Sequence, residues 1–346
     1  MRENLLTYTS QLLRDETPFF LLRKSGENHI QVSSQKSKKL YNQPHDKMAY
    51  AIFSKFQKSE DQIFVYAEVI QEFEWSVEVT KASHQSISSN SEARKDHEKL
   101  VSDAVQTIRN TELQKVVLSR KESVVRNHSD IQILENLLDS YPIANCYFFY
   151  HPAVGKWMGA TPETLLSYKN GVLQTMSLAG TQKLQNGVKV TWGKKEKQEQ
   201  NLVTDFIISA LQIAGVEKIK SGETETVQAG NLLHLRTQIQ ATTTFYNLQN
   251  CINELHPTPA VCGLPRSIAL KYILDHENYD RSFYTGYLGW NDPQSQTADY
   301  YVNLRCMELQ EDAIQLYAGG GITAMSDPTA EFEEVQNKLL TMASIV

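Results

Sequence analysis

The amino-acid sequence predicts an α+β fold built on large antiparallel sheets. Apolar runs rich in β-branched and aromatic residues come in neighbouring pairs, such as 164–168 and 172–178, which flank the turn sequence Lys169-Asn170-Gly171. Such pairs are typical of β-hairpins. Because the strand candidates gather in hairpins and do not alternate one by one with helices, the pattern disfavours a doubly wound parallel sheet.

Length and composition are those of an ordinary globular protein. The chain has 346 residues, 41% hydrophobic and 21% charged, and its net charge is -6 with both signs interleaved. This length suits one large unit or two average domains, and it can bury a sizeable core without disulfides or a structural metal. We expect no nucleic-acid partner, because phosphate binding requires a basic stripe.

The four cysteines, at 146, 251, 262 and 306, are isolated from one another and have no CxxC spacing. Two disulfides are possible by number, but the apolar flanks favour buried, reduced thiols. Residues 1–16 lack the basic start and apolar run of a signal peptide, and no apolar run approaches the ~20 residues that cross a bilayer. We therefore expect a cytoplasmic protein without a membrane partner.

The first ninety residues show the weakest pattern of apolar residues, so they predict few helices or strands. The apolar runs 18–22 and 62–69 predict strands, and the Ser/Asn-rich run 83–91 predicts an exposed loop. From residue 96 onward the spacing of apolar residues is more regular. Apolar residues at three-to-four spacing predict a helix around 100–108, and a β-branched run at 113–119 predicts the next strand.

Helices are also predicted at 131–138 and 194–211, and Pro328 opens a closing helix. The runs 146–150 and 156–160 predict a second hairpin. The remaining strand candidates are 232–241, 286–290, 300–308 and 313–318.

Paired carboxylates occur on two of the predicted helices. Glu196 and Glu199 are three residues apart on one helix, and Glu331 and Glu334 on the other, so each pair shares a face. The simplest interpretation is a solvated surface on which Glu334 and Lys338 form an ordinary (i, i+4) ion pair. Alternatively, one carboxylate from each helix holds magnesium and leaves positions open for water and an anionic substrate.

Three further charged residues stand in unusual places. Lys115 lies inside the apolar strand sequence QKVVLS, where it faces either solvent or a site that offsets the cost of burying an ammonium group. Glu163 follows the rigid turn sequence GATP, from which a carboxylate is presented either to solvent or into a cleft. Arg305 interrupts the predicted strand 300–308, and a carboxylate clamp and a structural ion pair fit it equally.

His256 lies in the proline-rich loop LHPTPAVCGLP, and a lone histidine is more often structural than catalytic. The glycines at 319–321 lead toward the closing helix and offer backbone N–H groups to an anion. The GxGxxG spacing of a dinucleotide site is absent, as are an HExxH sequence and a recognisable Ser/His/Asp triad. These patterns predict an α+β enzyme with a carboxylate–metal site and no more.

Taken together, the segments resemble the chorismate-utilising family, which includes isochorismate, salicylate, anthranilate and aminodeoxychorismate synthases. Nine motifs follow the family's order over about two-thirds of the chain, which makes chance agreement implausible. They are KVVLSR (115–120), GATPETLL (159–166), SLAGT (177–181), KKEKQEQNLV (194–203), HLRT (234–237), LHPTPAVCGLPR (255–266), YDRSFYTGYLGW (279–290), LRCMEL (304–309) and LYAGGGITAMSDPTAEFEEVQNKL (316–339).

The resemblance implies a fold and a division of the chain. The fold is a single large unit of two packed antiparallel sheets flanked by helices. Residues 1–90 would form its N-terminal part, and residues 91–346 the chorismate-binding catalytic region.

The resemblance also implies residue roles. Lys115 is similar to the general base that activates water, and Glu163 to the general acid. Glu199 and Glu334 would be the carboxylates of a Mg²⁺ site, with Glu196 as an outer partner. The substrate would be held by Gly180, Thr181, His256, Ala260, Arg305, Gly319, Gly321 and Lys338, with His234 nearby.

One motif departs from the family. Relatives have a sequence closer to EKDRHEH where this chain has KKEKQEQ, so Gln198 and Gln200 replace histidines while Glu199 is retained. The departure therefore concerns the surroundings of the expected metal site.

Two positions separate the members of the family. Ammonia-using relatives have glutamine in place of Lys115, and aminodeoxychorismate synthases have a nucleophilic lysine in place of Ala179. Both features favour water as the nucleophile and so favour isochorismate synthase, a Mg²⁺-dependent isomerase acting on chorismate. The first alternative is salicylate synthase, which forms isochorismate and then eliminates pyruvate. The second alternative is a family member that has lost catalysis and only binds its ligand. We expect a monomer without an amidotransferase subunit, whose product enters menaquinone, siderophore or salicylate synthesis.

Overall fold

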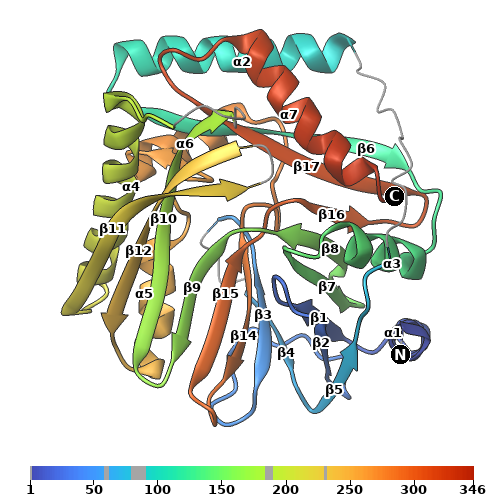
Figure 1. Cartoon of the computed structure of the whole chain (residues 1–346). Coiled ribbons are helices and arrows are strands. Elements are labelled where there is room, and N and C mark those ends of the chain that lie inside the picture. The colour runs from blue at the N-terminus through green and yellow to red at the C-terminus, as the bar shows by residue number, and fades with distance from the viewer. Residues whose placement is uncertain (1, 58–61, 79–90, 184–189, 230–231) are drawn as a thin grey trace.

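The computed structural model describes residues 2–57, 62–78, 91–183, 190–229 and 232–346. These residues form two antiparallel sheets flanked by helices (Figure 1), which confirms the predicted fold class. Strands from the first part of the chain belong to both sheets.

The larger sheet contains nine strands within the described residues, and all its neighbouring strands are antiparallel. Their order is β13 (Gly263–Leu264), β6 (Lys115–Val125), β17 (Ala313–Ile322), β16 (Cys306–Leu309), β8 (Gly155–Thr161), β7 (Asn145–His151), β1 (Phe19–Arg23), β2 (His29–Ser34) and β5 (Val69–Glu74).

The smaller sheet has eight strands in the same part of the chain, again antiparallel. Their order is β11 (Lys218–Ala229), β12 (Leu232–Thr242), β10 (Val172–Lys183), β9 (Thr164–Lys169), β15 (Thr297–Val302), β14 (Tyr287–Asp292), β3 (Tyr50–Ser54) and β4 (Ile63–Tyr66).

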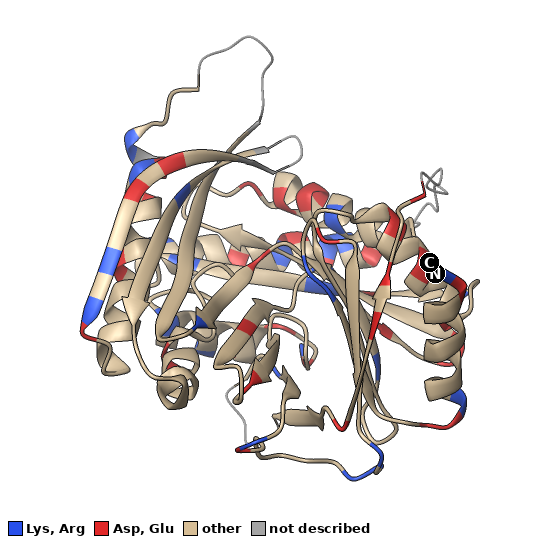
Figure 2. Cartoon of the chain, turned by 60° about the horizontal axis from the view of Figure 1, so that its bottom comes forward, with Lys and Arg blue, Asp and Glu red and all other residues tan. Residues whose placement is uncertain are grey.

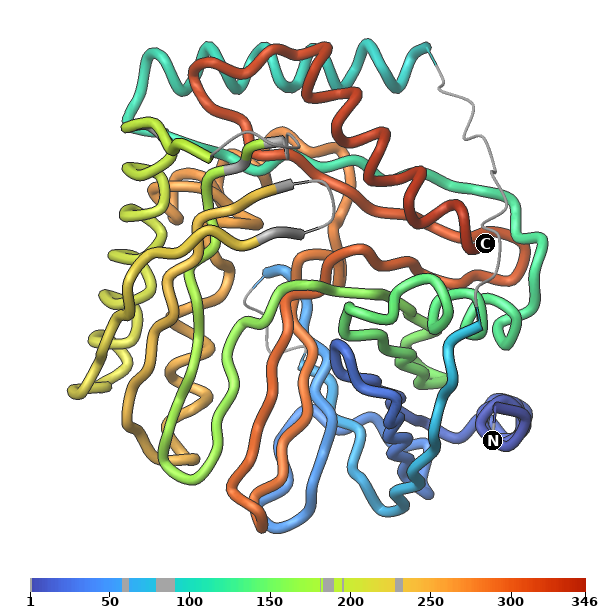
Figure 3. Tube along the Cα trace, viewed as in Figure 1, coloured from blue at the N-terminus to red at the C-terminus, as the bar shows by residue number. Residues whose placement is uncertain are grey.

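Helices cover the outer faces of the sheets (Figures 1 and 3). In the described residues they are α1 (Arg2–Arg14), α2 (Ser91–Asn110), α3 (Asp130–Ser140), α4 (Lys194–Ile213), α5 (Leu248–Leu255), α6 (Arg266–His276) and α7 (Pro328–Ala343), besides a short 3₁₀ turn at Phe245–Asn247. Helix α7 lies on β17 and packs beside α2, which also contacts β6 and β17, while α4 lies along β10 and β12. None of these helices is long and apolar enough to cross a membrane.

The core consists of apolar layers on both faces of the larger sheet. Along β1, Phe19 and Leu21 face the helix-covered side, whereas Phe20 and Leu22 face the smaller sheet. The sheets meet through aromatic side chains, and the ring of Phe53 stacks on that of Phe149 at 4.4 Å between centroids. Burial on both faces explains why β1 is an almost continuous apolar run.

Local sequence signals account for several element boundaries. Asn170 and Gly171 join β9 to β10 with φ values of 50° and 89°, a two-residue turn that these residue types favour. The Asp327 side chain accepts a hydrogen bond from the Ala330 amide and caps α7 at its predicted start. All four cysteines are free and buried, as predicted. Most of the predicted loop 83–91 lies outside the described residues.

The prediction of one strand over 300–308 is wrong. The chain forms β15 in the smaller sheet, leaves it after Val302 and enters the larger sheet as β16 at Cys306. Arg305 lies in this crossing with φ of 45°, a left-handed conformation that breaks an extended strand. The apolar pattern continues across the break because both strands are buried, so periodicity could not detect it.

Candidate active site

Lys115 and Glu199 form the centre of the site. Lys115 is the first residue of β6, and its Nζ lies 3.0 Å from Oε1 of Glu199 on α4. The two side chains are 18% and 34% exposed, so the pair is only partly in contact with solvent. Helix α4 packs against the smaller sheet through Val203, Ile207 and other apolar residues, and this packing fixes the position of the helix that carries Glu199.

Glu163 lies where the chain passes from β8 in the larger sheet to β9 in the smaller one. Its backbone is fixed, since its carbonyl accepts from the Val302 amide at 3.0 Å and its amide donates to Thr161 Oγ1 at 3.3 Å. Burial raises the pKa of the Glu163 carboxyl to about 7, and the positive charge of Lys115 acts against this rise. Glu163 can therefore carry a proton near neutral pH.

The crossing that contains Glu163 runs beside the crossing that contains Arg305. Besides the Val302–Glu163 bond, the Ala160 amide donates to the Arg305 carbonyl at 3.0 Å and Thr161 Oγ1 donates to the Val302 carbonyl at 2.6 Å. Both predicted residues therefore stand at the seam between the two sheets. Periodicity could not place them there, because the seam is a property of the tertiary fold.

The Arg305 side chain is exposed and lies toward the end of α7. Burial raises the pKa of Tyr141 to about 12, and the charge of Arg305 acts against that rise, so the two side chains are near each other. The Tyr141 hydroxyl in turn donates to the carbonyl of Thr341 at 2.7 Å. Thr341 and Lys338 both belong to α7, so Arg305 lies near the helix that carries Lys338.

The glycines of β17 make room for these side chains. A Cβ atom on Gly321 would lie 3.0 Å from Cε of Lys115, and one on Gly319 would lie 3.1 Å from the Tyr284 hydroxyl. Gly320 faces the other side, where a Cβ would approach Glu331 of α7 at 3.2 Å. Gly319 and Gly321 thus allow close packing over the strand on the face that carries Lys115.

Lys338 and Glu334 of α7 form an exposed pair at 2.8 Å, which is the ordinary helix pair that their spacing predicts. The ammonium group of Lys338 also donates to the carbonyl of Gly319 at 2.9 Å. It therefore reaches the same short glycine segment that Lys115 touches.

Glu196 and Gly180 lie together beside the first turn of α4. Gly180 occupies a bulge of β10 with φ of 65°, and a Cβ there would lie 3.2 Å from Cβ of Glu196. The His234 ring places Nδ1 3.2 Å from the Gly180 carbonyl, and burial lowers the pKa of this histidine. Thr181 pairs with His234 through the backbone, but its side chain lies outside the described residues.

The proline-rich loop divides between two environments. Ala260 lines a small cavity of about 40 Å³ together with Glu163, Thr258 and residues of α4. His256 instead faces Tyr287, at 5.0 Å between ring centroids, and its Nε2 lies 2.9 Å from the Phe56 carbonyl. Its side chain lines a separate cavity of about 850 Å³. Of the two, the structure brings only Ala260 up to Glu163.

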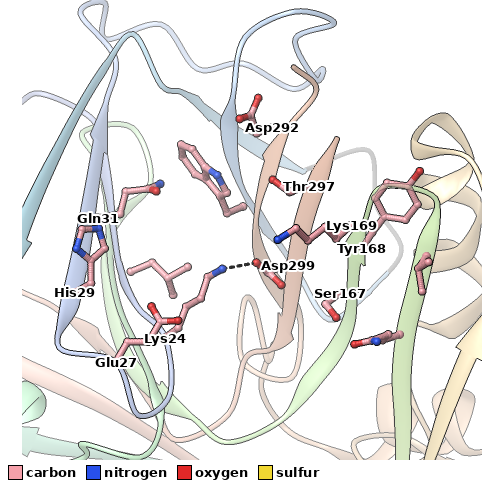
Figure 4. A pocket seen from close by; sticks show the side chains of 14 residues that line it. Lys24, Glu27, His29, Gln31, Ser167, Tyr168, Lys169, Asp292, Thr297 and Asp299 are labelled. Carbon is pink, nitrogen blue, oxygen red and sulfur yellow. Dashed lines mark hydrogen bonds and ion pairs between the residues drawn. The ribbon is translucent and has the colours of Figure 1, made fainter. Parts of the chain in front are cut away.

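A further polar cavity lies between β1 and β2 of the larger sheet and β9, β14 and β15 of the smaller sheet, and none of the predicted site residues is among the residues that line it. Its volume is about 590 Å³, and the Lys24–Asp299 ion pair, 2.6 Å long, crosses it (Figure 4). Elsewhere, acidic and basic residues are interspersed along the helices and strands (Figure 2).

Within the described residues, no three His, Cys, Asp or Glu side chains are arranged to hold a metal ion. Glu199 and Glu334 each face a lysine. On α7, burial raises the pKa of Glu331, and the charge of Glu334 raises it further. The carboxylate oxygens of Glu199 and Glu334 are donors of the kind that a hard divalent cation prefers, so the chemistry of these two side chains fits such an ion.

Glu277 and Arg281 form a buried pair for which the sequence predicted no role, although Arg281 lies in the motif 279–290. Both side chains are 2% exposed, and two guanidinium nitrogens of Arg281 donate to the two carboxylate oxygens of Glu277 at 2.6 and 2.7 Å. Arg281 also donates to the carbonyls of Val117 on β6 and Val261 in the proline-rich loop. Their (i, i+4) spacing indicated a possible pair, but surface pairs show the same spacing.

Comparison with known proteins identifies the family. The family model described as "Chorismate binding enzyme" matches residues 38–346. The isochorismate synthase MenF of Escherichia coli is 31% identical over 258 residues, 71% of this chain and 59% of the relative. The salicylate biosynthesis isochorismate synthase of Pseudomonas aeruginosa is 33% identical over 266 residues, covering 73% and 55%. This chain thus spans just over half the length of these two curated relatives.

Solved structures agree in fold. The Escherichia coli MenF structure aligns with a TM-score of 0.81 at 20% identity, covering 95% of this chain and 88% of that chain. Anthranilate synthase component I of Streptococcus pneumoniae aligns with a TM-score of 0.70 at 20% identity, covering 94% and 89%. The family model spans most of the sequence, including every residue discussed for the site. The chain therefore belongs to the chorismate-binding enzyme family.

Proposed function

We propose that this chain is an isochorismate synthase, which interconverts chorismate and isochorismate. The oxygen of water bonds to C2 of the ring, the ring double bonds shift, and the C4–oxygen bond breaks. A base takes a proton from the attacking water, and an acid protonates the departing hydroxyl so that it leaves as water. The observation that carries the proposal is the Lys115–Glu199 pair, together with the buried Glu163 carboxyl, whose pKa is raised by burial and lowered by the charge of Lys115.

Glu163 suits the acid, because burial raises the pKa of its carboxyl to about 7 and an acid works best when its pKa is near the working pH. Lys115 suits the base in its neutral form. That form requires the Glu199 carboxylate to be engaged by another partner, since the two are paired in the structure. Lys338, which donates to the Gly319 carbonyl, and Arg305 would hold the substrate's carboxylates.

We assign a Mg²⁺ site to Glu199 and Glu334, with Glu196 as an outer partner. The described structure shows these carboxylates at the positions stated above and not a formed metal cluster. Bound there, Mg²⁺ would balance the charge of the substrate's ring carboxylate and fix its orientation.

The relatives support water, and not ammonia, as the nucleophile. The two curated relatives named above, which are 31% and 33% identical to this chain, are described as isochorismate synthases. Lys115 and Ala179 are the residues that separate the water-using from the ammonia-using branches of the family. We accordingly propose a cytoplasmic enzyme that works without an amidotransferase subunit, as a monomer, and supplies isochorismate to menaquinone or siderophore synthesis.

Salicylate synthase remains the second candidate because of Tyr284. Its ring stacks on Tyr317 at 5.4 Å between centroids, and its hydroxyl lies beside Gly319. A hydroxyl at this place could grip the enolpyruvyl arm of isochorismate over the ring and favour pyruvate elimination. The small apolar side chain of Ala260, on the Glu163 side, would leave that arm freer.

The test is to incubate the purified chain with chorismate and Mg²⁺ and to follow isochorismate, pyruvate and salicylate separately. We expect isochorismate to form at the rate of chorismate loss, with little pyruvate. If pyruvate and salicylate rise together at that rate, the chain is a salicylate synthase. If chorismate is not consumed, it is a binding protein of the family.

A further inference from the structure

Gln200 joins α4 to the smaller sheet through a buried amide. Its side chain is 1% exposed, and Nε2 donates to Ser177 Oγ at 2.8 Å and to Thr237 Oγ1 at 2.9 Å. Ser177 belongs to β10 and Thr237 to β12, so a single amide group bonds to two neighbouring strands.

Neighbouring hydroxyls extend this contact. Thr204, one helical turn after Gln200, donates to the Gln200 carbonyl at 2.9 Å and lies 2.7 Å from Ser177 Oγ. On the other side, Thr224 of β11 lies 2.8 Å from Thr237 Oγ1. No member of this network is ionisable, so its bonds persist over the pH range in which Glu163 titrates.

The network lies directly beside the carboxylate of the site. Glu199 precedes Gln200, and on a helix consecutive residues point about 100° apart, so one can face the sheet while the other faces Lys115. The Gly180 bulge supports the same helical turn, because Gly180 lets Glu196 approach β10. The anchored amide and the glycine bulge together fix how α4 is rotated.

We infer that Gln200 is a positioning residue for the reaction proposed above: it sets the rotation of α4 and so holds Glu199 at Lys115. The inference rests on the proposed function only for its kinetic consequence. A leucine at 200 fills similar space without a donor, so the first turns of α4 lose their anchor. A histidine retains a ring N–H donor and restores it.

The test compares Gln200→Leu and Gln200→His with Gln198→Leu, which changes an exposed glutamine on the same turn. For Gln200→Leu we expect kcat to fall about 10-fold while KM changes less than about 2-fold, as for lost orientation of reacting groups. Gln200→His should recover most of kcat, and Gln198→Leu should equal wild type. Hydrogen exchange at 194–204 in the substrate-free protein should rise only in Gln200→Leu.

Wild-type kcat and wild-type exchange in Gln200→Leu would overturn the inference, as would a Gln200→His variant as slow as Gln200→Leu. If Gln200→Leu does not fold, Ser177→Ala and Thr237→Val remove the acceptors singly, and unchanged kcat and exchange in both would overturn it equally. If the wild-type chain consumes no chorismate, the proposed function is wrong, and the exchange data alone then decide whether Gln200 anchors α4.

Discussion

The ammonium group of Lys115 and the carboxylate of Glu199 lie 3.0 Å apart and join a strand of the larger sheet to a helix packed on the smaller sheet. Since proton transfer in the proposed reaction requires this lysine, Lys115→Gln should lower kcat roughly 10²-fold or more while the protein stays folded. Lys121→Gln changes an exposed lysine of the same strand and should retain wild-type kcat. Steady-state rates with chorismate, together with thermal unfolding, make the comparison. A Lys115→Gln enzyme of near-normal kcat would remove this residue from the reaction.

Because of Glu163, activity should decline at high pH. The acid acts only when protonated, and its pKa is raised to about 7, so kcat/KM should fall as pH rises above about 7. Glu163→Gln should lose roughly 10²-fold in kcat at its optimum and should lose this limb of the pH profile. A wild-type profile that stays flat to pH 9 would argue against Glu163 as the acid.

Glu163 should also affect stability in a defined pH window. Its folded pKa of about 7 exceeds its ordinary value of 4.5, so the native state binds more protons than the unfolded state between these values. The ionised carboxyl therefore costs stability progressively as pH rises from about 4.5 to 7. Relative to wild type, Glu163→Gln should be more stable at pH 8, by on the order of 2 kcal/mol, and nearly equal at pH 4. Denaturant unfolding of both proteins at the two pH values measures this difference.

Turnover should depend on a divalent cation. Chelation should abolish chorismate consumption and Mg²⁺ should restore it, because the carboxylates of Glu199 and Glu334 would then hold the ion. Glu334→Ala should weaken Mg²⁺ binding in calorimetry as well as activity. Glu333→Ala, an exposed neighbour that faces Arg94, serves as the control and should bind Mg²⁺ normally. Full activity in excess chelator is the result that excludes the metal assignment.

The buried Glu277–Arg281 pair should be important for stability. Arg281→Met leaves the Glu277 carboxylate buried without its partner and frees the Val117 and Val261 carbonyls, so the free energy of unfolding should fall by about 3–5 kcal/mol. Lys271→Ala removes an exposed helix pair with Asp275 and should cost about 0.5 kcal/mol or less. Urea unfolding of the two variants side by side makes the test. Equal losses would mean that the buried pair contributes no more than a surface pair.

The sequence was most informative where a local structure requires particular residue types at a particular spacing. Hairpin spacing predicted the antiparallel sheets, and Asn170-Gly171 predicted its turn because few other dipeptides adopt that conformation. Lys115 and Glu163 were singled out by their unusual places in the sequence, and the roles proposed for them come from the family motifs and not from periodicity. A lysine in a strand and a glutamate in a turn can each simply face solvent, and spacing alone cannot exclude this.

What could not be predicted depends on long-range packing. The polar strand β11 and the helices α1, α5 and α6 had no distinctive pattern. Arg305 was assigned to a strand because the residues on both sides of its crossing are buried. Gln200 was noted as a departure from the family, but its burial follows from the way α4 lies on β10. His256 was expected in the pocket, yet its ring turns toward Phe56, which lies 200 residues away in sequence.

The division of the early strands between two sheets has a consequence during synthesis on the ribosome. Strand β3 is buried along its whole length and pairs with β14, which begins at Tyr287. Residues 55–286 must be translated before this partner exists, which takes about 10–50 s at ~5–20 residues per second. Throughout that interval an apolar edge near the start of the nascent chain can pair only with β4. It is therefore the segment at which we expect general chaperones to bind the growing protein.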